Sequence, residues 1–153
     1  MRSLLGTTAL GAMVAATAAV PASAETIIST AVTAPQSTSA SGDIRISSTG
    51  SVKPANGTAV TLNTNNYVRN EGTIQVTGAN DSVGILGNSG VTGEITNSGT
   101  ITIDESFTPT DTDNDGDLDG PFGQGSGRFG IRVLGPGTFT GNIGHSGTIT
   151  VEG

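Results

Sequence analysis

A dense group of carboxylates marks the stretch DTDNDGDLDG at residues 111–120. Aspartate occupies every second position from Asp111 to Asp119, in a chain with only thirteen acidic and six basic residues. Carboxylates this close repel one another, so the stretch requires a bound cation, a basic partner or full solvation. Calcium prefers roughly six to eight oxygen ligands, and closely spaced carboxylates can supply them. Calcium coordination is therefore the first chemistry that this sequence suggests.

The order of residues here, D-x-D-x-D-G-x-x-D with Gly116 at its centre, resembles the calcium loops of EF-hand, dockerin and thrombospondin type 3 proteins. Phe122 stands where such loops carry a bidentate acid, and no flanking helices are predicted, so switching of the EF-hand kind is not expected. A solvated acidic loop and a loop that meets a basic partner are the alternatives. The resemblance implies calcium as the cofactor and, as ligands, Asp111, Asp113, Asp115, Asp117 through its backbone carbonyl, and Asp119.

A repeated motif organises the rest of the chain. An apolar residue, three mostly polar residues, Gly, Ser or Thr, and a second apolar residue recur at 46–52, 68–74, 95–101 and 143–149. In the last three copies a further β-branched residue follows two positions later, which is the alternation of a half-buried strand. Each copy therefore predicts a strand, a tight turn and a strand, with the turn glycine free to take a positive φ angle. Those glycines are Gly50, Gly72, Gly99 and Gly147.

Residues 83–103 align without a gap on residues 131–151, an offset of 48 residues. Strand-rich units that recur in phase, with no helical periodicity, predict an all-β fold: a right-handed parallel β-helix (β-solenoid) of few coils. A β-sandwich also uses short strands with frequent turns and is the competing architecture. It does not explain why the same motif recurs in phase.

The repeat divides the chain into segments. Residues 1–24 carry one arginine, an apolar run of small residues and an A-x-A site, which predicts a cleaved secretory signal peptide. Residues 25–42 suggest a linker or N-terminal cap, and 43–153 suggest β-helix repeats. Between equivalent strands the last unit is longer than the one before it, so residues 104–130 form an inserted acidic loop.

Catalytic candidates are few in this chain. It has no cysteine and one histidine, His145, which occupies the turn position of Asn70 and Asn97 in the sister units. The groups that a polysaccharide lyase or glycoside hydrolase could use are Asp104, Glu105, Arg128 and Arg132. Asp104 and Glu105 are expected to begin the exposed insertion, and Arg132 is expected to face outward. We therefore expect no enzyme activity and no catalytic residues in this segment.

The repeats, the Ala-rich leader and the absence of cysteine together resemble the N-terminal part of a bacterial autotransporter passenger domain, or a related β-helical adhesin. The resemblance covers about residues 43–153. It implies a non-catalytic, exported cell-surface, outer-membrane or extracellular module, a monomeric fragment that contacts a host surface or glycan. An outer-membrane translocator barrel would be a partner within a longer chain. The alternative is the first coils of a β-helical polysaccharide lyase or glycoside hydrolase. Nucleic acid is not an expected partner, because the chain carries a formal charge of −7.

Overall fold

The computed structural model describes residues 24–105 and 107–152, so the predicted signal peptide lies, except for its last residue, outside the described part. The described chain is almost entirely β-structure, with one four-residue helix, α1 (Thr38–Ser41). Within it, no helix has the length and apolar character needed to span a bilayer.

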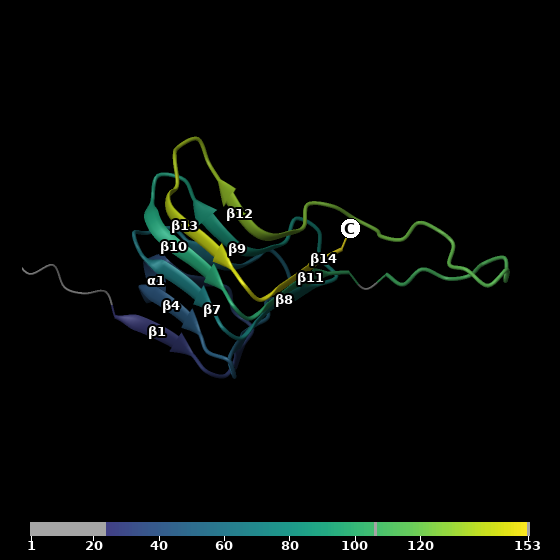
Figure 1. The fold of residues 1–153 in the computed structure, drawn as a ribbon, viewed down its shortest axis with the longest axis horizontal. Coiled ribbons are helices and arrows are strands. Elements are labelled where there is room, and N and C mark those ends of the chain that lie inside the picture. The colour runs from purple at the N-terminus through teal and green to yellow at the C-terminus, as the bar shows by residue number, and fades with distance from the viewer. Residues whose placement is uncertain (1–23, 106, 153) are drawn as a thin grey trace, which may run out of the picture.

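The strands form three parallel sheets (Figure 1). Sheet A contains β1 (Glu25–Ile28), β4 (Asp43–Ile46), β7 (Tyr67–Asn70), β10 (Thr92–Asn97) and β13 (Thr140–His145). Sheet B contains β2 (Ala31–Val32), β5 (Ser51–Val52), β8 (Thr73–Thr77), β11 (Thr100–Asp104) and β14 (Thr148–Val151). Sheet C contains β3 (Gln36–Ser37), β6 (Thr58–Leu62), β9 (Val83–Asn88) and β12 (Phe129–Leu134).

The chain visits sheets A, B and C in turn and then returns to A one strand further along the stack. We call one such pass a coil. The strand pairs between successive coils are parallel throughout the described residues, which is consistent with a parallel β-helix. The sandwich alternative is wrong, because a sandwich is built from antiparallel strands.

Columns of β-branched residues form the interior of the stack. Ile74, Ile101 and Ile149 are in register in sheet B, and the first two are completely buried. Val76, Ile103 and Val151 form the next inward column of the same sheet. Each fully buried Ile or Val contributes ~1.5–3 kcal/mol relative to exposure, so these columns account for the alternation seen in the sequence.

The recurring glycine of the motif is required by close approach of successive coils, and not by a positive φ angle as the sequence suggested. The positive φ angles of the structure lie at other glycines. A Cβ atom at Gly72 would overlap the carbonyl oxygen of Gly50; one at Gly99 would overlap that of Gly72; and one at Gly147 would overlap that of Gly99. The four glycines therefore stack on one another at the corner between sheets A and B.

A polar ladder runs beside this glycine column. The Asn70 Nδ2 group donates to Asn97 Oδ1 at 2.7 Å, and Asn97 Nδ2 lies 3.1 Å from His145 Nδ1. Asn70 and Asn97 are buried, whereas His145 is exposed. The predicted equivalence of the three positions is confirmed by the strand register. His145 thus continues a structural ladder, and one coil below Asn70 its place is taken by Ile46.

Replacing Asn97 with alanine should lower the free energy of unfolding by about 1–3 kcal/mol, because Asn70 Nδ2 loses its side-chain acceptor in a buried position. Denaturant unfolding followed by circular dichroism measures the change. Asn88→Ala is the control: Asn88 is a partly exposed amide in β9. Equal stability losses in the two variants would contradict a role for the ladder.

The ungapped 48-residue alignment holds in sheets A and B but fails in sheet C. Thr92 pairs with Thr140 and Ile101 with Ile149, as aligned. In contrast, Ile85 pairs with Ile131 and not with Val133. The difference is two residues, which returns side chains to the same face because strands have a period of two. Ile131 packs against the core, and Val133 is left 41% exposed.

Two segments stand out from the regular repeat. Residues 25–42, for which the sequence suggests a linker or cap, carry β1, β2 and β3, which pair with β4, β5 and β6 as a complete coil. Residues 105–128 join β11 to β12, where 78–82 join β8 to β9 one coil earlier, and no strand is found in their described part. This insertion projects far from the stack as a long loop (Figure 1).

Candidate metal centre and the root of the insertion

Three of the five predicted ligands converge at the outer part of the insertion. Asp111, Asp113 and Asp115 each offer a carboxylate oxygen, and these oxygens all lie within 4.8 Å of one another. Asp117 and Asp119 are not part of this group. For Asp117 the sequence predicts a backbone carbonyl ligand, and Asp119 Oδ2 accepts a hydrogen bond from the Thr112 amide at 2.6 Å.

Local backbone geometry turns the carboxylates toward one another. Gly116 has a φ angle of 100°, a conformation that favours glycine, and its amide donates to Asp111 Oδ2 at 3.1 Å. The amides of Asp115 and Asp117 donate to the carboxylates of Asp113 and Asp115, at 3.3 and 3.2 Å. The central glycine therefore closes the loop, as its place in the sequence pattern suggests.

The donor set of this loop fits a hard cation. Asp111 Oδ1 is buried, and the described residues provide it with no hydrogen-bond partner. An oxygen held in this way beside two further carboxylates is suited to a metal ion and unfavourable without one. No basic residue lies between Asp104 and Arg128, and the ion pairs found among the described residues do not involve this group.

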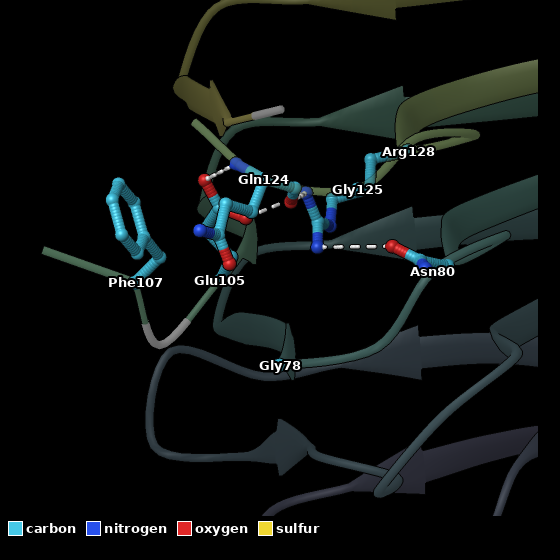
Figure 2. A pocket seen from close by; sticks show the side chains of 7 residues that line it. All are labelled: Gly78, Asn80, Glu105, Phe107, Gln124, Gly125 and Arg128. Carbon is cyan, nitrogen blue, oxygen red and sulfur yellow. Dashed lines mark hydrogen bonds and ion pairs between the residues drawn. The ribbon is translucent and has the colours of Figure 1, made fainter. Parts of the chain in front are cut away.

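A buried ion pair anchors the insertion to the stack. Arg128 Nη1 lies 3.3 Å from Glu105 Oε2, and the two side chains are 3% and 4% exposed. These residues are the first and the last of the insertion, and Figure 2 shows their side chains from close by. The expectation that Glu105 begins an exposed segment is wrong, because Glu105 is buried and its carboxylate is paired with the guanidinium of Arg128.

Arg128 also binds the surrounding backbone. Its Nε group donates to the Ala79 carbonyl at 3.1 Å, and its Nη1 group donates to the carbonyls of Gln124 and Glu152 at 2.9 and 3.0 Å. The Nη2 group reaches Asn80 Oδ1 at 3.3 Å. A single side chain thus joins the insertion, the β8–β9 turn and the end of β14.

Beside this pair lies a polar cavity of about 260 Å³, also lined by Phe107 and Gln124 (Figure 2). The backbone amide of Gln124 donates to Glu105 Oε1 at 2.6 Å, and Arg128 donates to Glu105 Oε2, so both carboxylate oxygens accept hydrogen bonds. Nearby, the pKa of Glu152 is raised, first by a side-chain hydrogen bond with Asp104 that favours the protonated Glu152 carboxyl and next by charge repulsion from Asp104. The groups considered for catalysis are therefore held mainly by structural contacts.

Arg132, the remaining catalytic candidate, lies apart from this group. Its guanidinium carbon stacks 4.3 Å from the centre of the Phe129 ring.

The sequence did not reveal the Glu105–Arg128 pair, because the two residues are separated by the insertion. Their positions at its two ends, one acidic and one basic, are the signal that could have suggested it. Comparisons with known proteins found no matching family, no similar curated protein and no similar solved structure.

Proposed function

We propose that this protein is a non-catalytic, exported surface module of the adhesin type, the N-terminal part of an autotransporter passenger that displays a calcium-ordered loop. Its scaffold in this proposal is a right-handed parallel β-helix. Its setting is the cell surface, the outer membrane or the extracellular space, and its partners are a host surface or glycan and, in a longer chain, an outer-membrane translocator barrel. Nucleic acid is not a partner.

The observation that carries the proposal is the convergence of Asp111, Asp113 and Asp115 in a loop that projects from a rigid stack. Long loops on rigid scaffolds are common places for binding. Calcium neutralises the three carboxylates and takes the partnerless Asp111 Oδ1 as a ligand, so the loop becomes ordered where a partner meets it. Asp117 contributes its carbonyl, and Asp119 contributes directly or through water.

The enzymatic alternative is weaker for this part of the chain. Both oxygens of Glu105 accept hydrogen bonds, and Arg128 donates to four further oxygen acceptors. A lyase or hydrolase needs such groups to face substrate. The first coils of a polysaccharide-degrading enzyme therefore remain the second proposal only for a longer chain.

Calcium titration of the chain by calorimetry should give saturable binding with about one ion per chain. Asp113→Asn combined with Asp115→Asn should abolish it, because two of the three converging carboxylates are removed. Asp117→Asn is the matched control, since the same acid-to-amide change in the same loop spares the backbone carbonyl and should preserve binding. Circular dichroism verifies that each variant retains its β-structure.

Absence of binding at millimolar calcium in a folded sample would contradict the calcium proposal and leave a solvated acidic loop. An equal loss of binding in the Asp117→Asn control would also contradict it, because affinity would then follow total charge and not the three converging carboxylates. A dependence on Asp113 and Asp115 alone supports a defined site.

A further inference from the structure

A second recess lies at the corner where sheet C gives way to sheet A, whereas the acidic loop joins sheet B to sheet C. Its volume is about 350 Å³, and residues from four successive coils line it. The register of β7, β10 and β13 places Tyr67, Glu94 and Asn142 side by side along one wall. Asn65 and Thr92 also contribute to its lining.

The floor of this groove is backbone. Gly93 and Gly141 are in register, and both line the groove. A Cβ atom at Gly93 would overlap the Asn66 carbonyl oxygen, and one at Gly141 would overlap that of Gly93. Neither position can carry a side chain, because its Cβ atom would meet the backbone of the neighbouring coil, so glycine backbone forms part of the groove lining.

Hydrogen bonds hold the polar groups of the groove in place. Asp43 Oδ1 accepts hydrogen bonds from Asn66 Nδ2 at 2.8 Å and from the Tyr67 amide at 3.0 Å. Asn65 Oδ1 accepts one from the Thr92 amide at 2.9 Å. These bonds leave Asp43 Oδ2 as an acceptor and Asn65 Nδ2 as a donor for a ligand. A site whose groups are fixed in advance loses little entropy on binding.

The Tyr67 side chain has contacts at its hydroxyl and over its ring. Its hydroxyl donates to Glu25 Oε1 at 2.8 Å, and the Arg69 guanidinium lies 5.7 Å from its centre. Desolvation, followed by the hydrogen bond that the hydroxyl donates to Glu25, raises the pKa of Tyr67, so the phenol stays protonated at neutral pH. The groove therefore presents a rigid, uncharged aromatic group beside its amides.

The charge of the groove selects among ligands. No basic side chain is among its lining residues, whereas Asp43 and Glu94 are. This composition disfavours anions. The outward face of the same strands carries Arg45, which is ion-paired with Glu71 at 2.7 Å, and Arg69, which lies over the Tyr67 ring and opposes the approach of a free cation there. Amides, carboxylates and one aromatic ring, without a neighbouring cation in the lining, are suited to a neutral ligand rich in hydroxyl groups.

We infer that this groove binds a neutral saccharide unit. Carboxylate and amide groups of Asp43, Glu94 and Asn142 hydrogen-bond its hydroxyls, and Tyr67 contacts an apolar face of the sugar ring. The groove is shallow and open, so it would contact one face of a short saccharide segment and not enclose it. The groove is separate from the acidic loop, so this inference does not depend on calcium binding.

The test is saturation-transfer NMR of the chain with three neutral probes: methyl glucoside, methyl galactoside and methyl mannoside. Glucuronate and glucosamine serve as the anionic and cationic counterparts. All spectra are recorded with calcium and again with EDTA. We expect saturation of at least one neutral glycoside in both conditions, and weaker signals from both charged sugars.

Two variants test the placement of the site. Glu94→Gln and Asn142→Ala should each weaken binding, by about tenfold for Glu94, because a hydrogen bond to a charged group is lost. Neither side chain forms a hydrogen bond with the described residues, so the fold should tolerate both changes. Gln75→Ala, at a partly exposed position in β8 of sheet B, is the control and should bind as the unmodified chain does.

Three results would overturn the inference. They are no saturation of any neutral glycoside in a folded sample, stronger binding of glucosamine or glucuronate than of every neutral probe, and binding that survives both groove variants unchanged. Binding that persists in EDTA but fails in Glu94→Gln supports the groove, whatever the outcome of the calcium titration.

Discussion

Replacing Arg128 with methionine lowers the free energy of unfolding by about 3–5 kcal/mol, the usual loss when one partner of a buried ion pair is removed. Glu105 would be left buried with only the Gln124 amide as a donor. The carbonyls of Ala79 and Glu152 would lose their side-chain donor as well. Urea unfolding monitored by circular dichroism measures this loss.

Arg132→Met is the matched control for Arg128→Met. It makes the same substitution four residues along the chain, where the guanidinium stacks on Phe129 and is partly exposed. The control should change stability by less than about 1 kcal/mol. The double variant Arg128→Met/Glu105→Leu should recover part of the loss, because it removes the unpaired buried carboxylate. A loss in Arg128→Met no larger than in the control would show that the pair does not anchor the insertion.

Gly99→Ala should destabilise the protein by about 3 kcal/mol or more, at the upper end of the range for overpacking. The new methyl group would collide with the backbone of Gly72 one coil below, and backbone cannot move aside as a flexible side chain can. The two coils must separate locally, which also strains the neighbouring Asn70–Asn97 hydrogen bond. Thermal or denaturant unfolding measures the effect.

Gly144→Ala provides the comparison for Gly99→Ala. A Cβ atom there would meet only the Thr96 side chain, at an ordinary 3.6 Å, and its φ angle is not among the positive ones. This change should alter stability by no more than about 0.5 kcal/mol. Similar losses in both variants would mean that backbone entropy, and not close stacking, explains the glycine column.

Strand positions in this protein were largely predictable from sequence, because packing repeats from coil to coil. The columns at Ile74, Ile101 and Ile149 were predicted from β-branched residues in one phase, and burial of those columns requires that phase. The His145 ladder position followed from the same alignment. The role of the motif glycine was not predicted correctly. Glycine is required there because a carbonyl group of the neighbouring coil lies too close for a Cβ atom, and the local sequence does not show which residues will stack on that position.

Within the candidate site, the convergence of Asp111, Asp113 and Asp115 followed from local spacing and the turn at Gly116. The pairing of Glu105 with Arg128 did not, because a contact across a long insertion depends on where its two ends meet the stack. The groove between sheets C and A was missed for a related reason. Its walls come from four coils, and each contributes residues that alone suggest only a polar turn.

The two-residue offset between β9 and β12 has a consequence for how this scaffold can vary over time. A strand whose register shifts by two positions keeps the same side chains facing inward. A shift of one position would instead expose its inward isoleucines and valines to solvent. Length changes inherited within a sheet are thereby confined to even steps. Corners are not subject to that constraint, and the corner between β11 and β12 holds one long insertion. Differences in length should therefore accumulate at the corners of this architecture, while the sheets keep a two-residue alternation of inward and outward side chains.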